Sequence, residues 1–368
     1  MPELYIGLMS GTSLDGVDGV LADFAGSLQV RAHASAPFDP ALKAELLALN
    51  RSGPDEIHRS QLAANALMRV YAQVVRELLA RTGVPAADVR AIGAHGQTVR
   101  HRPQAFDGTG YTVQLAQPAL LAELTGITVV ADFRSRDVAA GGQGAPLAPF
   151  FHRALFAREG EAVGVLNIGG ISNLTVLRPD GTQLGFDCGP GNALMDAWCQ
   201  RHLGQPYDAE GAWAAGAPFD PALLQALLSE PFFAAPPPKS TGRDLFDEGW
   251  LQQHLSPFPA LTAQQVQATL AELTATACAG EVQRHAPGLP RLYACGGGAL
   301  NEHLMRRLQA LLPATRVLSS AEAGLPPLQV EAAAFAWLAR KAVRQEALEL
   351  QSTTGALGAR VLGGIWPA

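Results

Sequence analysis

The sequence predicts an α/β fold of two domains. The chain has 368 residues, which is more than one ordinary hydrophobic core accommodates. Hydrophobic residues make up 48% and charged residues 16%, which is typical of a globular chain and excludes extensive disorder. A pattern of three strands with a small-residue turn after the first occurs twice, about 160 residues apart. Duplication of one α/β domain explains this repeat better than coincidence between two unrelated meanders.

The first copy of the pattern occupies the start of the chain. Residues 6–9, 17–24 and 28–34 are predicted as consecutive strands with glycine-containing turns. A long amphipathic helix follows, with apolar residues at helical spacing from Leu67 to Leu79 and Gly83 as its end. Two more strands are expected at 91–94 and 127–131. Residues 132–149 are rich in glycine and polar side chains, and we expect an inter-domain loop there.

The second copy begins at residue 162. Strands are predicted at 162–168, 174–177 and 184–186, with a small-residue turn at 169–173. Helices at 192–203, 264–284, 299–312 and 330–343 alternate with strands at 292–294 and 316–318. This order is typical of parallel α/β structure. The four prolines of 231–238 predict an irregular surface segment, and 239–244 is expected to form an ordered surface loop.

The opening turn is the first candidate site. Ser10, Gly11, Thr12 and Ser13 are small enough to let backbone N–H groups approach an anion. Gly11 and Gly16 stand five apart, as in a Walker loop, but the Lys-Ser/Thr pair that should follow is missing. A P-loop is therefore excluded. A plain hairpin turn and a phosphate-binding turn both remain open for these residues.

Asp187 is the strongest candidate for acid–base chemistry. It stands at the end of a predicted strand and is followed by Gly-Pro-Gly and the start of a helix. This places a carboxylate at the carboxyl end of a strand, beside a helix N-terminus that favours anions. Such a carboxylate can accept a proton from water or orient a metal. The alternative is an aspartate that closes a turn by bonding local amides.

Other polar segments offer weaker signals. Gly296, Gly297 and Gly298 leave room for a nucleotide ring or phosphate on the backbone, although a tight turn also uses glycine. His95 follows a strand and is either a substrate contact or a satisfied loop residue. Arg134 and Arg136 would point the same way in an extended segment and could hold a carboxylate. Glu331 opens an apolar helix, where it either contacts substrate or complements the helix dipole.

Composition excludes several classes of partner. The net charge of −6 and the absence of a basic cluster argue against nucleic acid. No apolar run reaches the ~18 residues of a membrane span, and no secretory leader is apparent at the start. The four cysteines form no CxxC pair, which favours reduced thiols. We therefore expect a cytoplasmic protein. The Gly-x-Ser-x-Gly elbow of acyl hydrolases is missing.

Together these motifs resemble the actin, hexokinase and Hsp70 ATPase superfamily, in which two RNase H-like domains hold ATP in the cleft between them. The resemblance narrows to the anhydro-N-acetylmuramic acid kinase family. It rests on MSGTSLDGVD (9–18), AHGQTVRHRP (94–103), DFRSRDVAAGGQGAPLAP (132–149), NIGGISNL (167–174), DCGPGN (187–192), YDAEGAWAAG (207–216), PPKSTGRDLF (237–246) and CGGGALN (295–301). These blocks span nearly the whole chain in the order of the family.

The resemblance implies a reaction and roles for residues. Water opens the 1,6-anhydro bridge of the amino sugar while ATP phosphorylates the released O6, within peptidoglycan recycling. Asp187 would be the base that activates the water. ATP would be bound by Gly11, Thr12, Ser13, Leu14, Asp15, Gly16, Val17 and Asp18, by Gly169 and Gly170, and by Gly296, Gly297 and Gly298. The sugar would be bound by His95, Arg134, Arg136 and Glu331.

The resemblance also implies domain bounds, a metal and an oligomer. Residues 1–131 with about 345–368 would form the first RNase H-like domain, and 132–344 the second. A homodimer is expected, and Mg²⁺ is expected because phosphoryl transfer needs charge neutralisation. Two departures stand out: Cys188 replaces an expected threonine, and Leu8 stands where the superfamily often has an acid. The Mg²⁺ ligands therefore stay open among Asp15, Asp18 and Asp187.

Two alternatives remain at this stage. One is another sugar or small-acid kinase of the same superfamily. The other is a non-catalytic, ATP-gated filament or chaperone module, which would usually carry a longer interaction domain than a chain of 368 residues provides.

Overall fold

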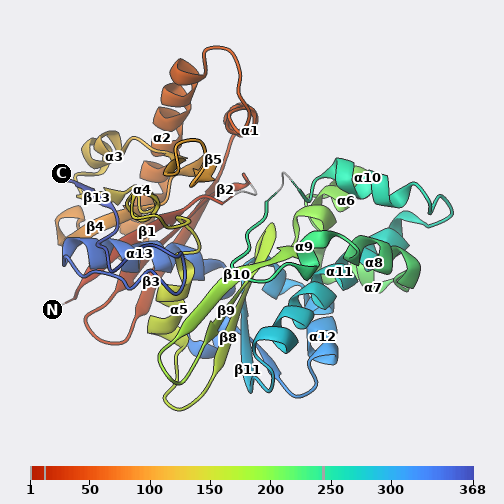
Figure 1. Cartoon of the computed structure of the whole chain (residues 1–368). Helices are drawn as coiled ribbons and strands as arrows, with labels where there is room; N and C mark the ends of the chain where they lie inside the picture. The colour runs from red at the N-terminus through yellow and green to blue at the C-terminus, as the bar shows by residue number, and fades with distance from the viewer. Residues whose placement is uncertain (1, 12–13, 243–244) are drawn as a thin grey trace. The chain divides into compact units, whose positions relative to one another are not determined.

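The computed structural model describes residues 2–11, 14–242 and 245–368. The chain divides into two compact units, Met1–Phe151 with Leu328–Ala368, and His152–Pro327 (Figure 1). The chain crosses from unit 1 to unit 2 between residues 151 and 152 and returns between residues 327 and 328, and these positions delimit the compact units. The bounds of the RNase H-like domains stay a prediction. Within the described residues, no helix has the length and apolar character needed to span a membrane.

Unit 1 is built on a six-stranded sheet. Its elements are β1 (Leu4–Met9), β2 (Gly16–Asp23), β3 (Gln29–Pro37), α1 (Pro40–Ala48), α2 (Glu56–Thr82), η1 (Ala86–Asp88), β4 (Val89–Ala94), β5 (Gln97–Pro103), β6 (Gly110–Leu115), α3 (Pro118–Thr125), β7 (Val129–Ala131), α4 (Ser135–Ala139), α5 (Ala148–Phe156, which runs on into unit 2), η5 (Pro327–Gln329, which begins there), α13 (Val330–Val343) and β13 (Gly364–Trp366). The strand order is β13-β7-β4-β1-β2-β3, and β5 pairs with β6 separately. β1 is antiparallel to β2 and parallel to β4.

Unit 2 contains a five-stranded sheet. Its elements are β8 (Val163–Ile168), β9 (Ile171–Leu177), β10 (Gln183–Pro190), α6 (Ala193–Leu203), η2 (Ala209–Gly211), α7 (Ala212–Ala215), α8 (Pro221–Leu228), α9 (Pro231–Ala234), α10 (Glu248–Leu255), α11 (Ala263–His285), β11 (Arg291–Cys295), η3 (Gly297–Leu300), α12 (Glu302–Leu311), β12 (Arg316–Ser319) and η4 (Ser320–Ala323). The strand order is β10-β9-β8-β11-β12.

The two sheets share one topology. In each, the first strand lies at the centre, the second and third strands follow antiparallel on one side, and the later parallel strands lie on the other. The first strands, β1 and β8, are both followed by the glycine turns that the sequence indicates. This shared order confirms the α/β fold of two RNase H-like units.

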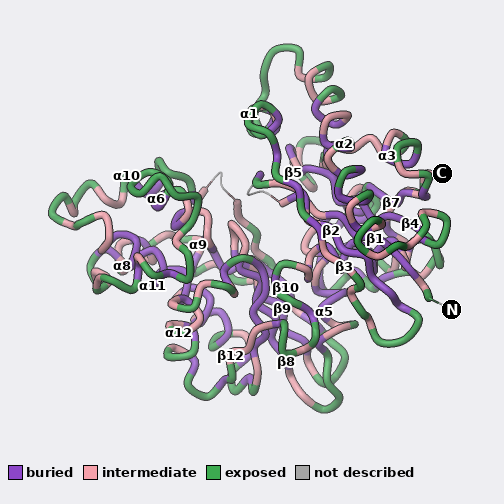
Figure 2. The backbone as a smooth tube through the Cα atoms, turned by 180° about the vertical axis from the view of Figure 1, so that it is seen from behind, coloured by how far each residue is buried: buried purple, intermediate pink, exposed green. Residues whose placement is uncertain are grey.

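Two helices cover opposite faces of the unit 1 sheet. The apolar stripe of α2, including Leu67, Tyr71 and Leu78, is fully buried with the side chains of β1 and β2, and the helix ends at Gly83 with φ 67°. On the other face lies α13 (Figure 1). In Figure 2 the central strands of each unit are largely buried, and the exposed backbone lies in the peripheral loops and turns.

Two paired glycines allow α13 to lie close to its sheet. Gly7 of β1 and Gly93 of β4 are register partners. A Cβ at Gly7 would lie 1.8 Å from the carbonyl oxygen of Ala332, and one at Gly93 would lie 2.0 Å from that of Phe335. Any side chain at either position would push the helix away. The two glycines therefore set where Glu331 and Phe335 come to lie.

Several sequence expectations about local structure were wrong. Residues 132–149 are not a loop throughout, because α4 and the start of α5 lie there. The turn at 169–173 contains only Gly169 and Gly170, since β9 begins at Ile171. The helix expected at 299–312 is split by Asn301, which caps α12 by accepting a bond from the Leu304 amide. The proline-rich stretch holds the short helix α9.

Candidate active site

The opening turn of unit 1 connects β1 to β2. The Leu14 amide donates to the Gly11 carbonyl at 3.2 Å, and Leu14 is buried with φ 57°, in the left-handed region. Gly16 is required by packing, because a Cβ there would lie 2.3 Å from the Ala36 carbonyl oxygen. The predicted phosphate contacts Thr12 and Ser13 lie outside the described residues.

A ring of hydrogen bonds fixes the base of this turn. The Ser10 hydroxyl donates to the Gly96 carbonyl at 2.8 Å and therefore accepts from the Tyr71 hydroxyl at 2.9 Å. The Gly96 amide donates to the Tyr71 oxygen at 3.2 Å, which closes the ring. Burial raises the pKa of Tyr71 well above its usual range, so the hydroxyl remains protonated. The ring joins the end of β1, α2 and the β4–β5 connection.

The two acids of the opening turn are partly exposed. Asp15 pairs with Lys43 at 3.3 Å, and Asp18 pairs with His33 at 3.3 Å. Among the described residues, no group of three or more His, Cys, Asp or Glu side chains is placed to hold a metal. Mg²⁺ is commonly held by one or two carboxylates together with phosphate oxygens and waters. The acids present therefore fit a metal that arrives with a nucleotide, and do not form an all-protein cage.

His95, which is buried, and Arg134, which is half-buried, form a polar pair. The Arg134 guanidinium donates to His95 Nε2 at 3.0 Å, so the imidazole is neutral and its Nδ1–H donates to the Ser10 carbonyl at 3.0 Å. Burial and the charge of Arg134 lower the pKa of His95 to about 3. Burial also lowers the pKa of Arg134 to about 10, opposed by the charges of Glu331 and Asp137. The Phe335 ring of α13 lies 4.8 Å from the imidazole.

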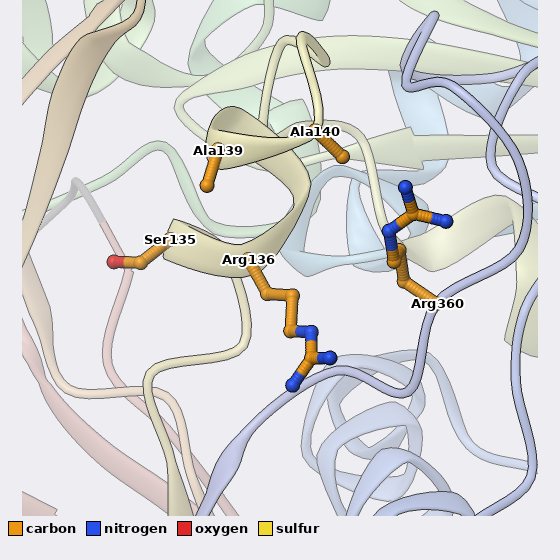
Figure 3. Close-up of a pocket in the computed structure, with 5 residues that line it drawn as sticks. All are labelled: Ser135, Arg136, Ala139, Ala140 and Arg360. Atoms are coloured by element: carbon orange, nitrogen blue, oxygen red, sulfur yellow. The ribbon is translucent and has the colours of Figure 1, made fainter.

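The structure therefore brings three of the four predicted sugar contacts into one electrostatic cluster: His95, Arg134 and Glu331. The fourth predicted sugar contact, Arg136, is separated from them. Residues 135–139 form α4, so the expectation that Arg134 and Arg136 alternate along an extended segment was wrong. Arg136 is exposed and lines an open pocket of about 370 Å³ with Ser135, Ala139, Ala140 and Arg360 (Figure 3).

In unit 2, Asp187 lies on the edge strand β10, directly before a register shift in its pairing with β9. Its Oδ2 accepts from the Thr241 amide at 2.9 Å, and its own amide donates to the Lys239 carbonyl at 3.1 Å. Thr241 is 54 residues away along the chain, so the carboxylate does not close a local turn. Burial raises the pKa of Asp187 to about 6, opposed by the Thr241 amide and the charge of Lys239.

Cys188 occupies a different environment from its neighbour. It is fully buried in the unit 2 core, and burial together with Cys278 raises the pKa of its thiol. The thiol therefore belongs to the packing of β10 against α11. Where the family resemblance implies a threonine hydroxyl, this chain therefore has a thiol in the core.

The second turn uses its carbonyls to hold the start of α6. The Gly169 carbonyl accepts from the Asn192 amide at 2.7 Å, and the Gly170 carbonyl accepts from Gly191 at 2.9 Å and Ala193 at 3.3 Å. Three N–H groups at the start of α6 therefore already have partners within the protein.

The triple glycine divides into two kinds of position. A Cβ at Gly296 would lie 2.5 Å from Asn167 Oδ1, and one at Gly298 would lie 2.3 Å from Ile168 Cγ2. Gly297 is exposed, and its Cβ would meet only Asn192 Nδ2 at 3.4 Å. Two of these glycines therefore serve packing against β8, and only Gly297 faces open space.

Sequence reasoning missed several polar residues of unit 2. Asp187, Asn173 and Asn167 are direct partners on three adjacent strands, so their side chains share one face of the sheet. Asn192 donates from Nδ2 to the Ile168 carbonyl at 3.1 Å. The two asparagines of NIGGISNL, one on each side of the turn, were the available signal. Lys239 and Thr241 were noted only as part of a surface loop, which was wrong because the side chain of Lys239 is 4% exposed.

Two units of one topology, each with a glycine turn after its first strand, define a two-unit α/β chain with the RNase H-like architecture of the actin and hexokinase class. The model of the family described as anhydro-N-acetylmuramic acid kinase matches residues 3–368. The chain belongs to the anhydro-N-acetylmuramic acid kinase family.

Relatives named anhydro-N-acetylmuramic acid kinase are similar over their full length. The protein of Variovorax paradoxus is 62% identical, with 100% of this chain and 99% of the relative covered. That of Pseudomonas putida is 53% identical, with 99% of each covered. Among solved structures, a ROK family glucokinase from Streptomyces griseus with glucose and AMPPNP gives a TM-score of 0.43 at 12% identity, covering 92% of this chain and 99% of that one. Component A of the (R)-2-hydroxyglutaryl-CoA dehydratase of Acidaminococcus fermentans gives 0.49 at 11% identity, covering 91% and 96%.

Proposed function

We propose that this chain is an ATP-dependent kinase that opens 1,6-anhydro-N-acetylmuramic acid with water and phosphorylates its O6. The product is N-acetylmuramic acid 6-phosphate, and the reaction belongs to peptidoglycan recycling. Family membership over residues 3–368 supports this reaction. The observation that carries it within the molecule is a carboxylate, Asp187, that is held by a distant backbone amide and has a pKa raised to about 6.

Asp187 acts as the general base in this proposal. Its carboxylate takes a proton from water as the water oxygen bonds to C1 of the sugar. The C1–O6 bond breaks, and O6 takes the γ-phosphoryl group of ATP, so ADP leaves. A base with a pKa near 6 is ionised at neutral pH and still accepts a proton effectively. The Thr241 amide donates to Oδ2 and thereby orients the carboxylate, and because an N–H group is a donor it does not compete with Asp187 for the proton of the water.

ATP is assigned to three backbone segments. These are residues 11–18, which run from the opening turn into β2, Gly169 with Gly170, and Gly296 to Gly298 as the adenosine turn. Within the segment Gly296 to Gly298, Gly297 is the glycine that has open space beside it. Mg²⁺ would neutralise charge on the phosphates, and the partly exposed Asp15 and Asp18 are suitable donors in type and number.

The sugar is assigned to His95, Arg134, Arg136 and Glu331. A guanidinium in a desolvated site binds a carboxylate strongly, and the lactyl group of the substrate supplies one. Neutral His95 fixes one edge of Arg134 through the 3.0 Å hydrogen bond. Arg136 would contribute from the exposed face of α4.

We further propose a cytoplasmic homodimer that binds neither nucleic acid nor membrane. The net charge of −6 argues against nucleic acid, and the four cysteines, all buried and none in a disulfide among the described residues, fit a reducing compartment.

The test is an assay of phosphorylated product from ATP with anhydro-N-acetylmuramic acid, hexoses or acetate. We expect phosphate transfer to the anhydro sugar with far higher kcat/KM than to the others. Preference for a hexose or for acetate would assign the chain to another kinase of the same class. ATP hydrolysis that no sugar stimulates would favour an ATP-gated module.

A further inference from the structure

The carboxylate of Asp187 is held from outside its own sheet. β10 is an edge strand, and the segment 239–241 lies along its free edge. Two hydrogen bonds join them: the Asp187 amide to the Lys239 carbonyl at 3.1 Å, and the Thr241 amide to Asp187 Oδ2 at 2.9 Å. The position of the carboxylate therefore depends on where this short segment is fixed.

Lys239 fixes the segment by burying its side chain. Its Nζ lies 3.1 Å from Glu281 Oε1 and donates to the Phe232 carbonyl at 3.2 Å. The same ammonium group lies 4.7 Å from the centre of the Phe232 ring. The side chains of Lys239 and Glu281 are 4% and 3% exposed, so the pair is almost fully removed from water.

Glu281 provides a rigid partner. It stands on α11, a helix of 23 residues that begins with a capping box at Thr262. Arg284 donates to Glu281 Oε1 at 2.5 Å, and His285 Nε2 lies 3.2 Å from Oε2. Arg284 and Lys239 therefore both contact Oε1 of Glu281, and these two contacts orient the carboxylate toward Lys239.

Stability alone is a weak reason for such a pair. Desolvation of two charges offsets most of their attraction, and well-packed apolar side chains of similar volume are often as stable. A charged pair does, however, prescribe one position for each partner, which apolar packing does not. In this protein the pair fixes the position of Lys239, and the backbone of Lys239 bonds to Asp187.

We propose that Lys239 and Glu281 are positioning residues for Asp187, which locate the segment 239–241 and thereby the carboxylate that activates water. The inference rests on the proposed function. Neither side chain contacts the reacting atoms in this account. Their effect on the position of Asp187 is transmitted through the Lys239 carbonyl and the Thr241 amide, and the charge of Lys239 in addition lowers the pKa of Asp187.

The test compares two disruptions of ion pairs on the same helix. Lys239→Met with Glu281→Leu replaces the buried pair with apolar side chains. Glu272→Gln is the matched control, because Glu272 also stands on α11, is 5% exposed and pairs with Arg307 at 2.7 Å, yet its carboxylate bonds to Arg307 and not to the segment 239–241. Steady-state kcat and KM for the anhydro sugar, with thermal melting, are measured for both.

We expect the double variant to melt as a folded protein, with kcat reduced roughly tenfold to a hundredfold and KM for the sugar within about twofold of the parent. The Glu272→Gln control should keep kcat within about twofold of the parent value. Should the double variant fail to fold, Glu281→Gln replaces it, and its kcat should fall with KM unchanged. An unchanged kcat in the folded pair variant, or an equal fall in the control, would overturn the inference. Absence of product from the parent protein would instead refute the proposed function.

Discussion

The Arg134 guanidinium donates a hydrogen bond to His95 Nε2 at 3.0 Å, and this contact fixes the imidazole as neutral. The other ring nitrogen donates to the carbonyl of Ser10, at the start of the opening turn. One neutral histidine thus links the proposed sugar-binding arginine to the proposed phosphate-binding turn within unit 1. The link gives a buried, uncharged histidine two hydrogen-bond partners, with its pKa lowered to about 3.

Replacement of Arg134 by lysine should weaken sugar binding. Lysine keeps the charge but loses the planar pair of donors that matches a carboxylate. We expect KM for the anhydro sugar to rise about tenfold or more, with KM for ATP nearly unchanged. Arg102→Lys is the control, because Arg102 is an exposed residue of the same unit. Equal kinetics for the two variants would remove Arg134 from the sugar site.

Asp187→Asn should fold and lose turnover. Loss of a general base costs about 10²-fold to 10⁴-fold in rate, and the amide can still accept the Thr241 bond. In the parent protein kcat/KM should fall as pH drops through about 6, because protonated Asp187 cannot take a proton from water. A pH–rate profile from pH 5 to 8 checks both points. Retained turnover in Asp187→Asn would exclude Asp187 as the base.

The Asp187→Asn variant should also be more stable than the parent protein at neutral pH. The folded protein raises the pKa of Asp187 from 3.8 to about 6, so it binds this proton more tightly than the unfolded chain does. The folding stability of the parent protein therefore falls as pH rises from 3.8 to about 6, and the full destabilisation by the buried charge is present above pH 6. Removal of the charge should recover at most about 3 kcal/mol in urea unfolding at pH 7.5. The difference should shrink as pH falls and vanish below about pH 3, under the unfolded pKa of 3.8, and a variant less stable at pH 7.5 would contradict the assignment.

Gly7→Ala should destabilise unit 1. The added Cβ would lie 1.8 Å from the carbonyl oxygen of Ala332, so α13 would have to move. We expect a loss of about 3 kcal/mol or more in the free energy of unfolding. Gly26→Ala is the control, because no atom lies within 4 Å of its added Cβ. Similar midpoints of urea unfolding for the two variants would show that the helix does not need this close approach.

Two neighbouring glycines should respond differently to alanine. Gly298→Ala places a Cβ 2.3 Å from Ile168 and should lower the melting temperature. Gly297→Ala meets only Asn192 at 3.4 Å, so it should fold normally and raise KM for ATP if the nucleotide lies on this backbone. Calorimetry and ATP titration separate the two effects. Normal ATP affinity in Gly297→Ala would remove this turn from the nucleotide site.

The sequence predicted most elements because periodicity and turn residues are local signals. The long helix ending at Gly83, the strands around both glycine turns and the helix at 330–343 were confirmed. Failures arose where tertiary contacts decide. α4 forms in a glycine-rich stretch and separates Arg134 from Arg136. Lys239 is buried by Glu281, a partner 42 residues away that local patterns cannot indicate.

The candidate site was predictable in its residue types and only partly in its geometry. Asp187 was identified from its place at a strand end, but the Thr241 amide that holds it lies in a distant segment. The triple glycine was interpreted as one open surface, whereas β8 occupies the space beside Gly296 and Gly298. Close backbone approach leaves the same sequence signal as ligand binding, because both require a missing side chain.

The most direct measurement follows oxygen from water into the product. The protein is incubated with ATP, Mg²⁺ and anhydro-N-acetylmuramic acid in ¹⁸O-labelled water, and the phosphorylated sugar is analysed by mass spectrometry and NMR. The account predicts one labelled oxygen at C1 and an unlabelled O6 that carries the phosphate. Label at O6, or phosphate on an intact anhydro sugar, would contradict it.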